Sequence, residues 1–275
     1  MFKIIFSGLV LLLFTSAGYS QSNTKDLNLS LIQSIDSSYQ TAQENIYKDL
    51  EFAAKKYRET IQLIDSLPRN TKDLRSYLKK QANAYRVLGS YAAMNHELVE
   101  ALELQEKSLD IKRRIGERES QIQNYKAMSA LWGDEGDMEK AGMTADSAYN
   151  IAIETNSKKY LSEAARGKAT FFRASQMPDS AEYYFQIAVK TADDAPGKVP
   201  KYAALDMYGR FLREEGRMNE SLTYVDQFLE ALEVNYDTVF FPAVFLTKGE
   251  TQLALNNPYD AIESYKQGLF YAQKT

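Results

Sequence analysis

The chain has 275 residues, of which 44% are hydrophobic and 25% charged, a composition that predicts a folded protein and argues against a disordered one. Its formal net charge of −4 argues against nucleic acid as a partner, because a polyanion repels an acidic surface. The absence of cysteine excludes disulfide bonds, thiol catalysis and thiolate metal sites. Six prolines and 13 glycines are few for the many turns of an all-β fold, so we expect helices.

Residues 1–20 have the pattern of a secretory signal peptide. Lys3 supplies the positive charge, an apolar run covers residues 4–14, and small residues follow up to Ser20. The run is too short to span a bilayer stably, so we expect cleavage between Ser20 and Gln21, with an uncleaved anchor as the alternative. No later stretch is apolar enough to cross a membrane, so the mature chain is expected to be exported, either periplasmic or secreted.

Small residues recur along the chain at a fixed step of 40 residues. One register consists of Ala101, Ala141, Ala181, Ser221 and Ala261. A second register, 12 residues upstream, consists of Gly89, Ser129, Ala169, Gly209 and Gly249. We expect small side chains at these positions because two antiparallel helices cross closely there, and a large side chain would force them apart.

A third register between the other two marks the turns. Its members are His96, Gly136, Gln176, Gly216 and Asn256. Gly, Asn and His tolerate a positive φ best, so we predict a tight turn at each position, between the two helices of one unit. Pro178 and Pro258 follow two residues after such a turn, where proline suits the first position of a new helix.

The residues within each unit resemble the tetratricopeptide repeat. Its second-helix signature (Ala, an aromatic residue four positions later, a small residue three positions after that) matches Ala181, Phe185 and Ala188, and also Ala261, Tyr265 and Gly268. Leu205, Tyr208 and Gly209, followed by the turn at Gly216, match the first helix. The 40-residue step exceeds the usual period of about 34 residues, so each helix is expected to be nearly a turn longer. Such lengthened units resemble the exported repeat regions of bacterial signalling proteins.

This resemblance implies an all-α fold, an α-α superhelix of about six helical hairpins. We expect a flexible N-terminal segment over residues 21–29 and a degenerate first hairpin over residues 30–68. Five tetratricopeptide-like repeats are expected over residues 76–275. The second of them, which is the third hairpin of the chain, departs from the pattern, because Ala145 stands where an aromatic residue is usual.

The chain offers little for catalysis or metal binding. His96 is the only histidine and occupies the turn register, so we interpret it as a turn residue. Asp134, Glu135 and Asp137 surround the turn at Gly136, but they lack the ligand spacing of a calcium loop. No glycine-rich phosphate loop or nucleophile elbow occurs. We therefore expect neither enzymatic activity nor a metal or other cofactor.

Binding of a protein or peptide is the function that the resemblance implies, on the concave face formed by the first helices. One position of these helices holds Arg86, Lys126, Arg166, Asp206 and Leu246. Further cations on the same helices are Arg173, Arg210 and Arg213. We predict a basic stripe that binds an acidic segment or a C-terminal carboxylate. The alternative is that these cations only pair with neighbouring carboxylates such as Glu163 and Glu214.

Two functional classes remain open. The first is a free-standing interaction scaffold. The second is the sensory input region of a signal-transduction protein, a histidine kinase or a LuxR-type regulator, whose membrane and output parts are not in this chain. Apolar residues 269–272 lie near Thr275, where a repeat array normally carries a polar cap. We therefore expect a partner, a second copy of the chain, or a continuation of the chain to cover them.

Overall fold

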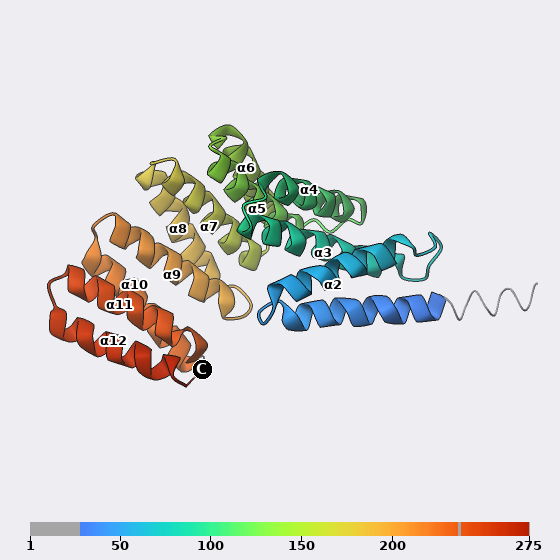
Figure 1. The fold of residues 1–275 in the computed structure, drawn as a ribbon. Coiled ribbons are helices and arrows are strands. Elements are labelled where there is room, and N and C mark those ends of the chain that lie inside the picture. The colour runs from blue at the N-terminus through green and yellow to red at the C-terminus, as the bar shows by residue number, and fades with distance from the viewer. Residues whose placement is uncertain (1–27, 236–237, 275) are drawn as a thin grey trace, which may run out of the picture. The chain divides into compact units, whose positions relative to one another are not determined.

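The structure, a computed structural model, describes residues 28–235 and 238–274. Throughout this part the chain forms helices joined by short turns, with no strand (Figure 1). It divides into two compact units, one up to Glu117 and one from Arg118 onward. We call them the N-terminal unit and the C-terminal unit and describe each by itself. The predicted signal peptide, and all but the last residues of the predicted segment 21–29, lie outside the described residues.

The N-terminal unit consists of two helical pairs. Its helices cover residues 28–45, α2 (Leu50–Asp65), α3 (Leu74–Met94) and α4 (Leu98–Arg114). The first two pack together through Tyr39 and Tyr57, whose ring centroids are 5.9 Å apart, and Ser38 Oγ donates to the carbonyl of Lys56 at 3.1 Å. These two helices, which together cover residues 28–65, form one hairpin.

The C-terminal unit continues the pattern of paired helices. Its elements are α5 (Gln121–Glu135), α6 (Met138–Glu154), α7 (Lys158–Ala174), α8 (Pro178–Asp193), α9 (Val199–Glu214), α10 (Met218–Val234), a short 3₁₀ helix (Thr238–Phe240), α11 (Phe241–Ala254) and α12 (Pro258–Ala272). Each odd-numbered helix packs against the next even-numbered one, and α7 also contacts α5 and α9. The predicted all-α architecture of consecutive hairpins is confirmed. No helix in the described ranges is both long and apolar enough to cross a membrane.

In the five hairpins from α3 onward, the turn between the two helices has a left-handed residue at the predicted position. The φ angles are 61° at His96, 85° at Gly136, 58° at Gln176, 76° at Gly216 and 62° at Asn256. In all five turns, the N–H of the next residue donates to the carbonyl five positions earlier, at 2.8–2.9 Å. This is the hydrogen bond of a Schellman motif, which satisfies a carbonyl that the helix end leaves unpaired.

The small-residue registers allow the paired helices to approach closely, but to different degrees. Ser221 Oγ of α10 donates to the carbonyl of Gly209 in α9 at 2.7 Å, so the two helices are almost in backbone contact there. A Cβ on Gly209 would still have 3.5 Å to its nearest neighbour. A Cβ on Gly249 would lie only 2.4 Å from the ring of Tyr265. Gly249 therefore has less room for a side chain than Gly209, because the Tyr265 ring lies over it.

An aromatic cluster fixes α9 within the C-terminal unit. Phe185 of α8 stacks on Tyr208 at a centroid distance of 5.8 Å and contacts Phe211 at 5.1 Å. All three side chains are buried, and burial of such a side chain stabilises the fold by roughly 1.5–3 kcal/mol. The helix that carries Asp206 and Arg210 is thus held in place by its opposite face.

Candidate peptide-binding site

A pocket of about 360 Å³ lies on the odd-numbered helices of the C-terminal unit, where α5, α7 and α9 meet. Its charged lining residues are Lys126, Arg166, Arg173 and Asp134. Met207 of α9 also lines it. The lining thus has three cations and one carboxylate, an excess of positive charge that Glu163 and Glu214 offset in part. We call it the Arg166 pocket.

Lys126 lies across α7 because that helix has a glycine opposite it. A Cβ on Gly167 would lie 3.2 Å from Cγ of Lys126, so any larger residue would displace the lysine stem. The ammonium group of Lys126 is 3.6 Å from a carboxylate oxygen of Glu163. This separation is longer than that of a charge-assisted hydrogen bond, so the ion pair is loose.

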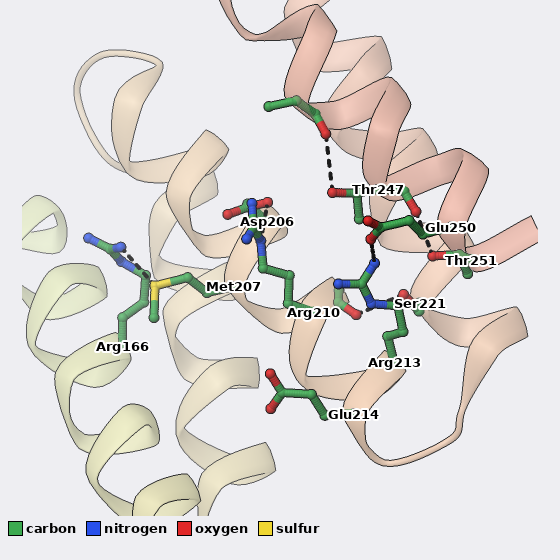
Figure 2. A network of polar contacts seen from close by, with 12 residues as sticks. Arg166, Asp206, Met207, Arg210, Arg213, Glu214, Ser221, Thr247, Glu250 and Thr251 are labelled. Carbon is green, nitrogen blue, oxygen red and sulfur yellow. Dashed lines mark hydrogen bonds and ion pairs between the residues drawn. The ribbon is translucent and has the colours of Figure 1, made fainter. Parts of the chain in front are cut away.

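Arg166 is under-satisfied by the protein. Its Nη1 donates to the thioether sulfur of Met207 at 3.1 Å, and sulfur of this kind is a weak acceptor (Figure 2). Its Nε is buried and finds no acceptor among the described residues. A buried donor without an acceptor costs about 1–3 kcal/mol, so the fold maintains this arrangement at the expense of stability.

The electrostatic surroundings of Arg166 reflect this burial. Desolvation lowers the pKa of Arg166 from its ordinary value, while Glu163 and Asp206 raise it in part. Arginine nevertheless stays protonated in proteins. The pocket therefore contains a permanent positive charge with little water around it, and a carboxylate there would be attracted more strongly than at an exposed surface.

Most of the other predicted cations are engaged in ion pairs. Arg173 pairs with Glu214. Arg210 pairs with Asp206 and Arg213 with Glu250 (Figure 2). Arg173 donates to both oxygens of its partner, at 3.0 and 3.1 Å. These three cations pair with neighbouring carboxylates, as the alternative interpretation of the basic stripe expects. The structure brings Lys126, Arg166 and Arg173 together in one pocket.

Arg86 lies on α3, in the N-terminal unit. It donates to Oδ1 of Asn83 at 3.0 Å. It also acts on Lys112, a buried lysine of α4. Burial, followed by the charge of Arg86, lowers the pKa of Lys112 to about 7, while Glu117 raises it in part. Arg86, which the sequence assigns to the basic stripe, thus interacts in this unit with Asn83 and with the buried Lys112.

A second pocket of the C-terminal unit, of about 240 Å³, lies between α9, α10 and α11. Its apolar lining residues are Val199, Tyr202, Ala203, Phe228, Phe240, Ala243 and Val244. Asp206 and Arg210 complete the lining. We call it the Phe240 pocket. The sequence pattern does not predict it, because its residues come from segments that only the packing of three helices brings together.

The N-terminal unit has a larger hollow of about 610 Å³, beside the start of α2 and the turn between α3 and α4. Its charges are mixed: Lys55 and Arg58 face Asp49, Glu51, Glu97 and Glu100. Arg58 is 4.0 Å from a carboxylate oxygen of Glu100 and lies over the ring of Tyr91. Four carboxylates against two cations give the hollow an excess of negative charge, so it does not suit an acidic ligand.

The residues considered for catalysis and metal binding have structural roles. His96 is exposed in a left-handed turn. Asp137 caps α6 by accepting from the N–H of Lys140 at 3.0 Å, and its contacts with Lys140 hold the pKa of Asp137 below the usual range. In the described part of the chain, no three potential metal ligands come together.

Comparison with known proteins relates the chain to solved structures. No protein-family model matches it, and no curated protein sequence does. BtubC (BKLC) from P. vanneervenii is 14% identical, with a TM-score of 0.58 over 90% of this chain and 91% of that one. The Rap conjugation gene regulator of plasmid pLS20, solved with the Phr* peptide, is 13% identical, with a TM-score of 0.61 over 89% and 75%. A Podosopora anserina protein with nearly identical TPR-like repeats is 14% identical, with a TM-score of 0.51 over 74% and 96%.

These identities are too low to carry function, but the similarity covers most of the chain. The shared property is an array of consecutive helical hairpins, which is also what the described residues form. By its fold, the chain is a tetratricopeptide-like helical repeat protein.

Proposed function

We propose that this protein is a non-catalytic scaffold that binds a peptide or protein segment on the odd-numbered helices of its C-terminal unit. An acidic group of the ligand occupies the Arg166 pocket. The observation that carries the proposal is the under-satisfied guanidinium of Arg166, whose Nη1 donates to the weak thioether acceptor of Met207 and whose buried Nε has no acceptor among the described residues. A carboxylate can accept from the two Nη groups at once, in the bidentate geometry that suits arginine.

The nature of the pocket supports binding over chemistry. Ser129 and Thr170 line it, but both hydroxyls are committed to backbone carbonyls: Ser129 Oγ donates to Ala141 at 2.8 Å and Thr170 Oγ1 to Arg166 at 3.0 Å. A nucleophile would need a neighbouring base to activate it. Asp134 is the one carboxylate among the described lining residues, and the cations and apolar groups around it favour binding of an anion.

The Rap regulator similar to this chain was solved with a peptide, which favours a peptide as the ligand class. This support is an analogy between folds, because one fold hosts many functions. The acidic character of the ligand comes instead from the charges of the Arg166 pocket.

A random dodecapeptide library displayed on phage tests the proposal. Selection on the purified protein is expected to enrich Asp and Glu, because a carboxylate is the strongest acceptor that a peptide side chain can offer to Arg166. Arg166→Ala and Lys126→Ala are expected to lose this enrichment. Lys158→Ala is the matched control, since Lys158 lies on the same helix but pairs with Asp194 and does not line the pocket.

Circular dichroism of each variant establishes that it is folded. If Arg166→Ala selects the same acidic peptides as the unsubstituted protein, the Arg166 pocket is not the binding site. If the unsubstituted protein selects no acidic peptide, the proposed ligand class is wrong.

We also propose that the protein acts outside the cytoplasm, in the periplasm or after secretion. The charge, apolar run and small residues of positions 1–20 support this. N-terminal sequencing of the protein from its native cells is expected to begin at Gln21. A chain that begins at Met1 and stays in the cytoplasmic fraction contradicts the proposal.

A further inference from the structure

We propose that the two pockets of the C-terminal unit recognise one extended peptide at two points. An acidic residue binds in the Arg166 pocket, and an aromatic or branched aliphatic residue binds in the Phe240 pocket. The inference rests on the proposed function and adds a second determinant and a fixed spacing between the two.

The Phe240 pocket has the chemistry of an apolar anchor site. Tyr202, Phe228 and Val244 form its buried wall, whereas Val199 is 65% exposed and Phe240 is 43% exposed at its edge. Tyr202 meets Phe228 and Phe240 at centroid distances of 5.4 and 5.9 Å, the latter edge to face. An aromatic ring of a ligand can join this set in the same geometry, and a branched aliphatic side chain can fill the same hollow.

Helix α9 connects the two pockets. Met207 lines the Arg166 pocket, while its neighbour Asp206 lines the Phe240 pocket together with Arg210. Arg210 is 48% exposed and donates from Nε to Asp206 at 2.9 Å. Figure 2 shows this pair between Arg166 on one side and Arg213 on the other. A peptide that reaches from one pocket to the other must therefore cross α9 over polar side chains, which suits its main chain.

The helical geometry sets the spacing. Neighbouring helix axes are about 8–10 Å apart, and the path runs from α7 across α9 to the groove beside α11, about one and a half such steps. The pockets are also displaced along the helices, since Arg166 and Arg173 line one, whereas Val199 and Tyr202, earlier in α9, line the other. Together these displacements give roughly 15 Å, or about five residues of extended chain.

The experiment uses the same dodecapeptide library. The unsubstituted protein is expected to enrich sequences in which Asp or Glu is separated from an aromatic or branched aliphatic residue by about five positions. Ala243→Trp should fill the Phe240 pocket, because Ala243 lines it from a partly exposed position on α11. This variant is expected to retain the acidic preference and lose the apolar one. Ala243→Ser, which leaves the hollow open, should select both.

Synthetic versions of the most enriched dodecapeptide quantify the effect by fluorescence anisotropy. Replacing its aromatic or aliphatic anchor with Ala is expected to weaken binding to the unsubstituted protein by about tenfold. The same replacement should have little effect on Ala243→Trp, if circular dichroism shows that variant to be folded. Two glycines inserted between the acidic and the apolar residue should also weaken binding.

The two proposals fail in distinguishable ways. Acidic peptides with no apolar residue at a fixed distance would overturn the two-point inference and leave the proposed function intact. Identical selections by Ala243→Trp and the unsubstituted protein would overturn the two-point inference in the same way. The absence of acidic enrichment overturns both proposals.

Discussion

At the scale of single residues, the turn register shows what a local pattern can predict. Gly136 and Gly216 occupy left-handed turns at no steric cost, whereas Gln176 has a φ of 58° and a side chain that opposes it. The turn at Gln176 was nevertheless predictable, because its neighbours in the register, one step of 40 residues away on each side, are glycines. The weak hydrogen bonding of the Arg166 guanidinium could not be predicted, because its acceptor is the sulfur of Met207, 41 residues along the chain.

Lys112 predicts a pH dependence of stability. Its pKa is about 7 in the folded protein, against an ordinary value of 10.5. Between these values the unfolded chain binds more protons than the folded one, so the free energy of unfolding contributed by this group rises as the pH rises from 7 toward 10. Below pH 7 both states are protonated, and the contribution of Lys112 is constant and unfavourable.

Replacing Lys112 with Met removes this buried charge while keeping the length of the side chain. Lys112→Met is expected to be more stable than the unsubstituted protein at pH 6.5, with the difference shrinking by pH 9.5. Thermal unfolding over that range measures it. Tyr57, whose pKa burial raises to about 12, acts in the opposite direction only above about pH 10, where unfolded tyrosine ionises. A constant difference between the two proteins contradicts the prediction.

At the scale of helices, the spacing of small residues predicts where helices cross but not how closely. Gly209 and Gly249 share one register, yet a Cβ would have 3.5 Å of room at the first and 2.4 Å at the second. The difference comes from the neighbouring side chains, since the Tyr265 ring lies over Gly249, whereas Ser221 of α10 faces Gly209 with a short side chain. Such differences in packing cannot be read from a period.

The two glycines make a matched pair of tests. Gly249→Ala is expected to lower the free energy of unfolding by about 1–3 kcal/mol, because the ring of Tyr265 must move. Gly209→Ala should be neutral or raise stability by about 0.5–1 kcal/mol, because alanine favours a helix and fits there. Urea unfolding of both variants measures the difference. Equal effects would show that the crossings are alike.

Ion pairs between neighbouring helices also recur along the chain, at positions that the small-residue registers do not predict. Lys168 is 2.7 Å from Asp146, and Lys248 is 2.8 Å from Asp226. In both pairs the lysine follows its partner by 22 residues, so the same bridge recurs two repeats later. The ammonium group of Lys168 also lies over the ring of Tyr184, at 4.5 Å from its centroid. This bridge connects α6, α7 and α8 and explains why a cation on a first helix need not serve a ligand.

At the scale of the whole molecule, the hairpin architecture was predictable because each hairpin depends on contacts within one unit of sequence. The candidate site was predictable only in part. Lys126 and Arg166 fall in one register, and so their proximity follows from the repeat. The Phe240 pocket depends on where α9, α10 and α11 meet, which a register of small residues does not specify.

The homo-oligomer expected through the last repeat stays a prediction. Helix α12 has three well-exposed apolar side chains along one face: Tyr259 at 87%, Ile262 at 51% and Leu269 at 60%. If a second copy covers this face, light scattering coupled to size exclusion is expected to show a dimer that Ile262→Glu and Leu269→Glu dissociate. A monomer at all concentrations would contradict self-association through α12.

The contact between Arg166 and Met207 has a consequence for oxidation. A methionine sulfoxide carries an oxygen that accepts hydrogen bonds far more strongly than a thioether. Met138 also lines the pocket and is exposed, so the test uses a Met138→Leu background. In that background, mild peroxide is expected to convert Met207 into a strong internal partner for the guanidinium and to weaken the binding of acidic peptides, whereas the further substitution Met207→Leu should leave binding equal before and after treatment. The same sulfur that leaves Arg166 under-satisfied would make binding in this pocket sensitive to an oxidising environment.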